Sequence, residues 1–524
     1  MRTRARGWLL LPAVALVTLL LALPLVEVAR LAVATEGPVH VEYALARLRA
    51  SLVVAVLSVV AALAVGLPAA WLLARREFPG RRTLLAVVTV PFVLPGLVAA
   101  IAWLAWAGPR GGLGVALPPL ALVVLVHAFF NQAVVVRLVG AAWGHQDPRL
   151  GDAARALGAS PWQVFLRVDV PLAAPAIGAA ALLTFLFSFA SFAPVLVLGG
   201  QDWATTEVGV WLESRRGYWR SAAILALVPL AVTALAAAAY AWLSRRAAAR
   251  HEPVPGALVR RKFTRHDAPL LGLASALTTL VVLGPLAALG ERALRVGDGH
   301  GLANFAALAS SDAGTFLATT PWEAAGHSAT FALAAAAIAV PLGTLAAVSL
   351  ARRADAWTDA FLALPLGVSA ITLGVGFLLL FDTEPFDLRA TAVLVVLSHA
   401  LLAMPLALRS VFAVAVHVPT RLAEAARTLG AGPMRAFASV ELPLLAPGIA
   451  VAAVFALAVS LGEFAAASVL VRPEHTTLPV LLGRALARPG ESRAGQAYAL
   501  AALLGLLTTA LFVAAERLRP RGVS

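Results

Sequence analysis

The sequence predicts an all-helical, polytopic membrane protein with about twelve transmembrane helices in two six-helix repeats. Three observations predict this fold. Of the 524 residues, 61% are hydrophobic and only 13% are charged, roughly half the charged share of a globular protein. Apolar runs of about 20 residues, enough to cross roughly 30 Å of hydrocarbon as a helix, recur along the chain. Two distant segments also share one pattern of prolines and glycines. An ordinary water-soluble fold is therefore excluded.

Apolar runs between charged or proline- and glycine-rich breaks predict the individual spans. Twelve candidate helices begin near Trp8, Ser51, Leu84, Pro118, Ala173, Ser221, Leu270, Ser328, Phe361, Ala392, Ala446 and Ala497. The first is followed by Ala32-Val33-Ala34, which resembles the cleavage site of a signal peptide. Its apolar region is longer than a signal-peptide core, and Glu27 and Arg30 intervene before that site. We therefore expect an uncleaved anchor.

The distribution of basic residues predicts the orientation of the spans. With twelve spans, the termini and the even-numbered loops carry 25 of the 41 Lys and Arg residues, whereas the odd-numbered loops carry 14. Loops on the cytoplasmic side of a membrane are enriched in Lys and Arg. We therefore expect both termini in the cytoplasm.

The chain contains an internal repeat. An offset of 272 residues aligns 152–177 with 424–449, with 14 identities in 26 positions. The shared residues include Gly158 with Gly430 and Pro171 with Pro443, so the repeat preserves backbone geometry as well as hydrophobicity.

This repeat predicts the domain organisation. We expect residues 1–243 to form the first repeat, 244–267 a basic cytoplasmic linker and 268–524 the second repeat. Each repeat should contain six transmembrane helices, and the two should lie parallel in the membrane.

Composition also limits the function classes. A net charge of +14 suggests nucleic acid, but no soluble basic domain carries it, so we expect no nucleic-acid partner. The absence of cysteine excludes disulfides and thiolate metal sites. Lys262, the only lysine, lacks the glycines of a phosphate-binding loop, so any ATP hydrolysis must come from another subunit.

The repeated segment reads as two short helices followed by a span. Asp147 is suited to cap the first helix and Gly158 to end it, and Ser160 with Gln163 can form a capping box for a second helix that ends before Pro171. The second copy repeats this plan with Thr420, Glu424-Ala425-Ala426-Arg427, Gly430 and Pro433. One such loop would be interpreted as a well-capped connector. Two copies at equivalent points favour a docking surface for another protein.

The motif of these loops resembles the EAA loop of ABC importer permeases. Its positions are Asp152, Ala153, Ala154 and Gly158 in the first copy and Glu424, Ala425, Ala426 and Gly430 in the second. The first copy has Asp for Glu and Val for Leu, both mild changes of size. The resemblance implies a type I permease fold in the bacterial inner membrane and no catalytic residue, metal or cofactor. It also implies two copies of a cytoplasmic ATPase, which dock on these loops, and a periplasmic or lipid-anchored substrate-binding protein.

Shorter stretches narrow the substrate. The fused two-half layout of this chain is similar to that of the permeases for iron(III) and thiamine. Short stretches of the sequence resemble those of the thiamine permeases more closely. They are residues 127–131, 189–193, 198–200, 204–207 and 477–479. We therefore expect thiamine, with iron(III) as the rival.

Polar and aromatic residues within spans are candidates for the substrate path. Glu463 is the most conspicuous carboxylate inside a span and would suit a cationic substrate, although a structural helix-to-helix hydrogen bond explains it equally well. His127 and Asn131 share one helical face, where they either bind a polar ligand or join helices. Phe192 and Phe464 occupy equivalent positions in the two repeats.

Two other function classes remain as alternatives. An ion-coupled secondary transporter also has two six-span halves, but it requires buried carboxylates or histidines as ion carriers, and the spans offer few. A membrane enzyme has little support, because no metal-ligand cluster or nucleophile–base arrangement stands out in the sequence.

Overall fold

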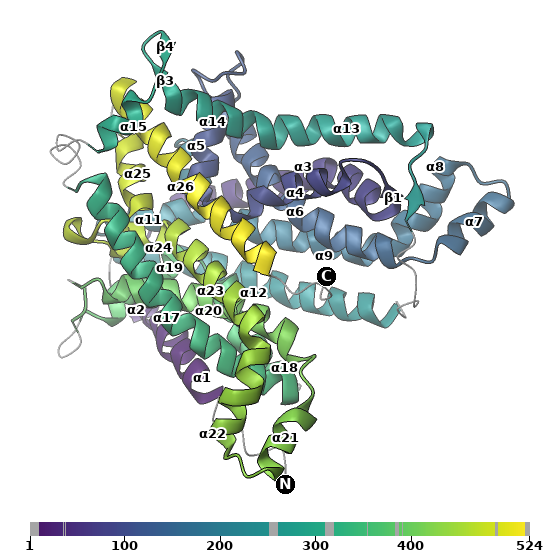
Figure 1. The fold of residues 1–524 in the computed structure, drawn as a ribbon. Helices are drawn as coiled ribbons and strands as arrows, with labels where there is room; N and C mark the ends of the chain where they lie inside the picture. The colour runs from purple at the N-terminus through teal and green to yellow at the C-terminus, as the bar shows by residue number, and fades with distance from the viewer. Residues whose placement is uncertain are drawn as a thin grey trace. The chain divides into compact units, whose positions relative to one another are not determined.

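The structure is a computed structural model that describes residues 10–34, 36, 38–250, 260–309, 319–353, 355–382, 387–389, 391–487 and 491–518. Helices dominate it (Figure 1). The elements before residue 260 are α1 (Leu11–Val17), η2 (Thr18–Ala22), α2 (Leu23–Ala34), α3 (Val41–Arg75), β1 (Arg76–Glu77), α4 (Arg81–Thr89), η3 (Val90–Val93), α5 (Gly96–Ala107), α6 (Pro119–His145), α7 (Pro148–Ala156), α8 (Pro161–Val164), η4 (Phe165–Asp169), α9 (Val170–Phe189), α10 (Ala193–Leu198), α11 (Thr206–Arg215) and α12 (Trp219–Arg250).

The remaining elements follow residue 260. They are β2 (Arg261–Lys262), η5 (Arg265–Asp267), α13 (Ala268–Thr278), η6 (Thr279–Leu283), α14 (Gly284–Leu294), β3 (Arg295–Val296), β4 (Gly299–His300), α15 (Ala303–Leu308), α17 (Pro321–Arg353), α18 (Ala356–Ala363), η7 (Leu364–Gly367), α19 (Ala370–Leu380), α20 (Val393–Ala415), α21 (Thr420–Thr428), α22 (Pro433–Ala436), η8 (Phe437–Glu441), α23 (Leu442–Gly462), α24 (Ala465–Leu470), η9 (Pro473–His475), α25 (Leu478–Leu486) and α26 (Glu491–Leu518).

The predicted number of spans is confirmed. Within the described residues, ten helices are long and apolar enough to cross a membrane, or up to twelve if each of two bent pairs is one span. The bent pairs lie where the spans starting near Leu84 and Phe361 were predicted, and they turn by 112° and 96°. In the first pair, Pro95 forces Leu94 into an extended conformation (φ −69°, ψ 139°), which breaks the helix. Sequence hydropathy detects the apolar run but not this bend.

The described residues pack as two compact units. Unit 1 draws on 1–39, 210–226 and 293–524, and unit 2 on 40–209 and 227–292. Each unit therefore contains chain from both predicted repeats, so packing units and sequence repeats do not coincide. The boundaries 1–243, 244–267 and 268–524 stay a prediction, and residues 251–259 of the linker lie outside the described residues.

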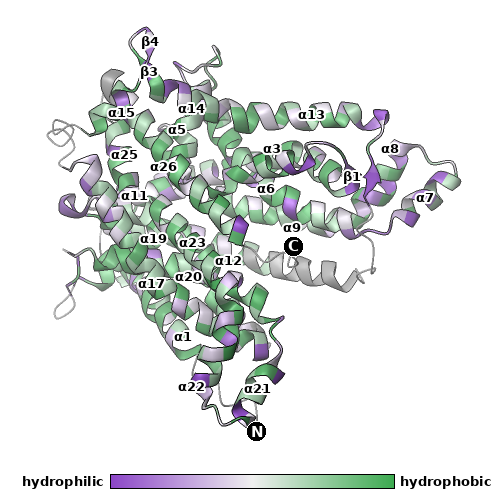
Figure 2. Cartoon of the chain, in the orientation of Figure 1, coloured by the Kyte–Doolittle hydropathy of each residue, from purple (hydrophilic) through white to green (hydrophobic). Residues whose placement is uncertain are grey.

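Unit 2 is built around α3, α6 and α9, which pack on one another, with α13 against α3. Its core contains small and large apolar side chains from these helices, including Ala70, Leu72, Val135, Trp143 and Ala173. After α3, β1 pairs in parallel with β2, the start of the described chain that follows the linker gap. In Figure 2 the helices are largely hydrophobic, and hydrophilic residues gather around β1 and α7.

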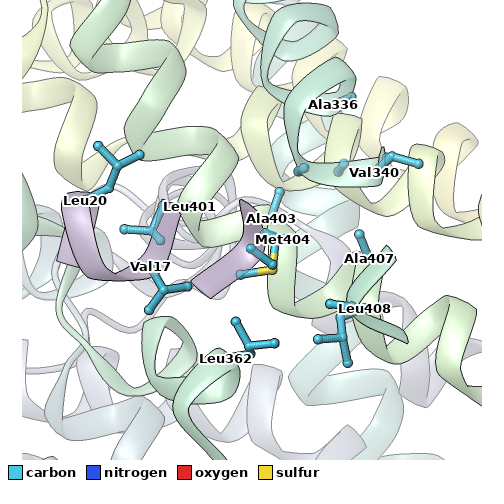
Figure 3. Packing of buried hydrophobic residues seen from close by; sticks show 14 of the residues in the cluster. Val17, Leu20, Ala336, Val340, Leu362, Leu401, Ala403, Met404, Ala407 and Leu408 are labelled. Atoms are coloured by element: carbon cyan, nitrogen blue, oxygen red, sulfur yellow. The ribbon is translucent and has the colours of Figure 1, made fainter. Parts of the chain in front are cut away.

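Unit 1 repeats this arrangement with α17, α20 and α23, which also pack on one another, while α2 packs against α19. Figure 3 shows its core, where Val17 and Leu20 from the first span meet Leu401 and Met404 of α20. The only other sheet in the described residues is the antiparallel pair β3 and β4. The three-helix arrangement thus occurs once in each unit.

Irregular helical turns also occur in equivalent pairs. The π-helical turns η2 and η6 lie within the first span of each predicted repeat, and η4 and η8 lie immediately before α9 and α23. The predicted end of the helix before Pro171 is therefore wrong, because α8 continues through η4 into α9. Proline lacks an N–H and clashes with the carbonyl four residues earlier, and a widened π turn accommodates both effects.

Glycines allow the long helices to approach closely. A Cβ atom at Gly66 in α3 would lie 2.8 Å from the Cβ of Val135 in α6. A Cβ atom at Gly343 in α17 would lie 2.8 Å from the backbone nitrogen of Leu408 in α20. Small residues at such crossings are how membrane helices gain packing without a hydrophobic driving force.

We expect Gly343→Ala to destabilise the protein, because the added methyl meets backbone that cannot rotate away. Overpacking of this kind costs about 1 to 3 kcal/mol of unfolding free energy. Thermal unfolding in detergent measures it, with Gly326→Ala in the same helix as control. Gly326 faces open space, so its replacement should leave the melting temperature unchanged or raise it. Equal melting temperatures for the two variants would contradict the close approach.

Candidate functional site

The first interhelical loop, residues 146–169, has the predicted helix–stop–helix form. The side chain of Asp147 caps α7 by accepting from the N–H of Arg149 at 2.9 Å. Gly158 ends α7 with φ +87°, and the N–H groups of Gly158 and Ala159 donate back to the carbonyls of Arg155 and Ala154. This is a Schellman motif, which places a left-handed residue after the helix. Ser160 and Gln163 form the predicted capping box of α8.

The second interhelical loop, residues 418–441, repeats this geometry. Gly430 has φ +90°, and the N–H groups of Gly430 and Ala431 donate to the carbonyls of Arg427 and Ala426. The suggested equivalence of Thr420 to the capping Asp147 is wrong, because Pro419 occupies the cap position and Thr420 is the first helical residue. α22 begins at Pro433, and Gly432 at its N-cap position offers no side-chain cap. The shared stop, rather than the shared caps, defines the two loops.

The predicted motif residues lie on the accessible surface of both loops. Those in the first are Asp152, Ala153, Ala154 and Gly158, and those in the second are Glu424, Ala425, Ala426 and Gly430. Ala154 and Ala426 are half-buried and the other six are exposed. The helices that carry them, α7 and α21, lie beyond the ends of the spans that they connect (Figure 1). The geometry therefore leaves this face of each loop open to another protein.

Sequence reasoning missed the apolar residues of the loops. Leu157 is 90% exposed and its equivalent Leu429 is 89% exposed, each directly before the left-handed glycine. Trp162 and its equivalent Met434 are also exposed. The same two positions of each loop therefore expose large apolar side chains. The 272-residue offset pairs these positions, and that signal was available in the sequence.

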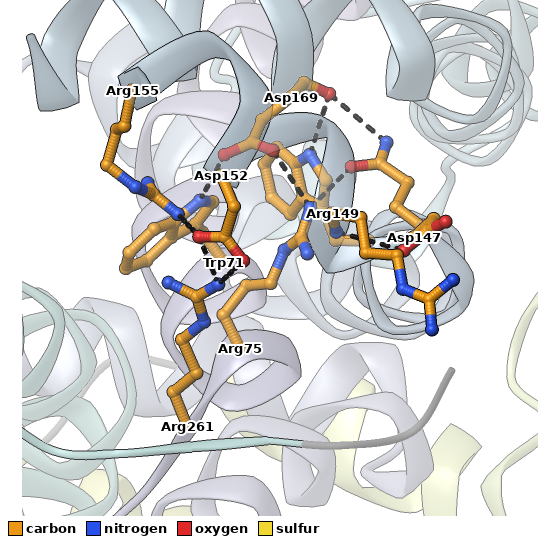
Figure 4. Close-up of polar contacts among 10 residues, drawn as sticks. Trp71, Arg75, Asp147, Arg149, Asp152, Arg155, Asp169 and Arg261 are labelled. Carbon is orange, nitrogen blue, oxygen red and sulfur yellow. Dashed lines mark hydrogen bonds and ion pairs between the residues drawn. The ribbon is translucent and has the colours of Figure 1, made fainter. Parts of the chain in front are cut away.

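Asp152 is tied to two arginines. Its carboxylate accepts from Arg155 in α7 at 2.6 Å and from Arg261 in β2 at 2.7 and 2.6 Å (Figure 4). The Arg155 contact joins residues three apart on one helix, whereas the Arg261 contact spans 109 residues of sequence. In the second loop the equivalent residues Glu424 and Arg427 are both described, and no ion pair joins them. Among the described residues, the first loop thus has a tether to the chain after the linker gap that its equivalent lacks.

Hydrogen bonds from Arg261 and Arg155 lower the pKa of Asp152 from 3.8 to about 2. Because the folded pKa lies below the unfolded value, the contribution of this tether is complete above about pH 4 and is lost as the pH falls through about 2. The chain has no cysteine, so a spin label at Ala156→Cys reports on α7 alone. We expect constant label mobility from neutral pH to about pH 5. A mobility change within that range would contradict the ionised tether.

In unit 2, the predicted polar residues of α6 bridge helices. The Nδ1 atom of His127 lies 2.9 Å from the hydroxyl of Ser58 in α3, and the amide of Asn131 donates to the hydroxyl of Ser188 in α9 at 3.3 Å. Both side chains are buried, and Phe192, just before α10, is buried as well. These contacts join α6 to α3 and α9, as polar residues within membrane bundles commonly do.

In unit 1, Glu463 lies at the junction of α23 and α24. Its carboxylate accepts from the N–H groups of Ala466 at 3.0 Å and Ala467 at 2.9 Å, so it caps the start of α24. The Nε2 atom of His399 in α20 lies 3.4 Å from the carboxylate, and its Nδ1 atom lies 2.7 Å from the hydroxyl of Ser460. Phe464 is buried beside Gly483. The equivalent histidines of the two repeats thus have different partners, and Ser191 occupies the position of Glu463 in the first.

Asp169 and Glu441 are further buried carboxylates that sequence reasoning missed. They occupy equivalent positions at the ends of η4 and η8, and each forms an ion pair of 2.8 Å, with Arg75 and Arg352 respectively. Within the described residues, no group of three or more histidine, aspartate and glutamate side chains is arranged to hold a metal ion.

Comparison with known protein families gives two matches along the chain. The model of the binding-protein-dependent transport system inner membrane component family matches residues 63–249 and again residues 339–522. Each match contains one interhelical loop.

Individual relatives fall into two groups. The thiamine transport system permease proteins of Escherichia coli (strain K12) and Brucella melitensis biotype 1 are 29% and 28% identical to this chain over 469 and 468 residues, 86% and 85% of its length. These alignments cover 84% and 82% of the two relatives. The molybdenum transport system permease protein of Azotobacter vinelandii is 36% identical over 168 residues, which are 30% of this chain and 74% of that protein.

Proposed function

Because the chain belongs to the family of binding-protein-dependent transport system inner membrane components, we propose that it is the two-half permease of an ATP-driven importer for thiamine. It is a multi-pass inner membrane protein of the ABC importer permease class with two fused halves. One observation carries the thiamine assignment: permeases named for thiamine align with both halves at once, whereas the molybdenum permease aligns with 30% of the chain. The short stretches in 127–131 and 204–207 support the same substrate.

Two cytoplasmic ATPase subunits dock on the two interhelical loops in this proposal. The contact residues are Asp152, Ala153, Ala154 and Gly158 in the first loop and Glu424, Ala425, Ala426 and Gly430 in the second. The exposed Leu157 and Leu429 supply the apolar centre of each contact. Both termini then lie in the cytoplasm, and a periplasmic or lipid-anchored binding protein delivers the solute from the opposite side. The chain itself hydrolyses no ATP.

The substrate path is proposed to pass Glu463, His127, Asn131, Phe192 and Phe464. The cationic ring of thiamine suits a carboxylate and aromatic faces. His127 and Asn131 are held by Ser58 and Ser188, so their remaining polar atoms have fixed directions.

The experiment is uptake into proteoliposomes. The chain is co-expressed with the ATPase and binding-protein subunits sought in neighbouring reading frames, and labelled thiamine uptake is measured with and without ATP. We expect ATP-dependent uptake that excess iron(III), molybdate or sulfate does not compete away. Uptake that survives ATP depletion and collapses with the ion gradient would instead indicate a secondary transporter. Uptake of iron(III) in place of thiamine would show that the substrate is iron(III) and not thiamine.

Glu463→Gln should lower ATP-driven thiamine uptake about tenfold or more, because a hydrogen bond to a charged group is worth about 1.5 to 3 kcal/mol. Uptake and membrane protein level are measured together. Ser460→Ala is the matched control, since it removes the hydroxyl that contacts the Nδ1 atom of His399 and leaves the charge of Glu463 unchanged. Normal uptake by Glu463→Gln, with coupling to ATP hydrolysis intact, would remove Glu463 from the path.

A further inference from the structure

A buried ion pair occurs at the same place in both halves. Asp169 ends the π-helical turn η4 and pairs with Arg75 in the last turn of α3, while Glu441 ends η8 and pairs with Arg352 in the last turn of α17. Asp169 and Glu441 are separated by the repeat offset of 272 residues. Both arginines come from an Ala-Arg-Arg sequence at the end of a long helix. The pair is therefore a repeated feature of the architecture.

The first pair sits in a wider polar network. Trp71 of α3 donates to the Asp169 carboxylate at 3.4 Å, and the backbone carbonyl of Asp169 accepts from Trp143 at 3.0 Å and Gln146 at 3.2 Å. Arg75 also donates to the side chain of Gln146 at 2.6 Å. Figure 4 shows Trp71 and Arg75 converging on Asp169 next to the first loop. The junction of loop and span is thus fixed to the preceding long helices.

The carboxylate of the second pair is more deeply buried than that of the first. The Glu441 side chain is 1% exposed and that of Arg352 is 23% exposed. A buried charge is costly unless it is paired, and removing one partner leaves the other uncompensated. Such a pair is poor at adding stability, because apolar residues of equal volume often do as well. Its presence in both halves therefore points to a role in positioning.

We propose that Arg75–Asp169 and Arg352–Glu441 are struts that transmit movement of each interhelical loop to the long helices α3 and α17. This rests on the proposed docking of ATPase subunits on the loops. A π turn is a weak point of a helix, at which a loop would otherwise bend independently of its span. The ion pair fixes that point to a second helix, so force applied at the loop moves two helices together. These four are positioning residues and are not proposed to touch the solute.

Spin labels on the chain alone test the positioning. The chain lacks cysteine, so Ala156→Cys and Thr428→Cys, at exposed equivalent positions, report on the first and second loop separately. Asp169→Asn should increase label mobility at 156 and leave 428 unchanged, and Glu441→Gln should do the reverse. The label on the untouched loop shows that the variant is folded. Asp169→Glu and Glu441→Asp keep the charge and should restore most of the restraint.

Coupling is tested in the complex with its ATPase subunits. Asp169→Asn and Glu441→Gln should retain ATPase binding, while thiamine uptake per ATP hydrolysed falls about tenfold or more, as expected for loss of one buried partner. A purely structural role would lower uptake and hydrolysis in parallel. Unchanged label mobility in both variants, or increased mobility with unchanged uptake per ATP, would refute the proposal that the ion pairs are struts. Neither result would affect the proposed function. A wild-type complex with no ATP-driven uptake would refute the proposed function, whatever the label measurements show.

Discussion

Leu157→Glu combined with Leu429→Glu should abolish association of the permease with its ATPase subunits. Both leucines are about nine-tenths exposed and stand next to the glycine that ends the docking helix. Truncating the apolar centre of an interface costs about 2 kcal/mol or more per site, and a buried carboxylate costs further. The two loops act together, so each single variant should retain part of the binding that the double variant loses.

Co-purification of the ATPase with the permease in detergent measures this effect. We expect the double variant to bind at least about a thousandfold more weakly than the wild type, which follows from losing about 4 kcal/mol or more in total. Leu302→Glu is the matched control, since Leu302 is also exposed but precedes α15, far from either loop in sequence. Wild-type co-purification of the double variant would show that the ATPase contacts another part of the chain.

The sequence predicted the docking loops well because their geometry is encoded locally. Asp147, Gly158 and Ser160 each act within five residues of their own position, through caps and a left-handed stop. Propensity rules describe such short-range hydrogen bonds directly. The transmembrane spans could be predicted equally well, because the length of a hydrophobic run alone identifies them.

Tertiary pairing was not predictable in the same way. Arg75 and Asp169 are 94 residues apart, and Arg261 and Asp152 are 109 apart. A single sequence does not indicate which of its distant residues come into contact. The packing of α2 with α19 in unit 1 and of α13 with α3 in unit 2 was missed for the same reason. The 272-residue offset marks Asp169 and Glu441 as equivalent, but only the ion pairs in the structure distinguish them from incidental charges.

Gly158→Pro or Gly430→Pro should uncouple ATP hydrolysis from transport. Both glycines have φ near +90°, and both donate an N–H to the end of the docking helix. Proline fixes φ near −65° and has no N–H, so it cannot form this turn. Alanine reaches the left-handed conformation at a cost of about 1 to 2 kcal/mol and keeps the N–H, so Gly158→Ala and Gly430→Ala should have intermediate effects.

Gly432→Pro separates the loss of this turn from a general effect of proline in the loop. Gly432 has φ −63° and ψ 163°, which proline adopts, and a Cβ atom there meets nothing within 4 Å. This control should transport thiamine normally, whereas Gly430→Pro, two residues away, should hydrolyse ATP with uptake at background. Normal uptake by Gly430→Pro would mean that the left-handed stop does not transmit the ATPase movement. Equal loss in both variants would mean that the loop tolerates no proline, and the assignment of coupling to Gly430 would fail.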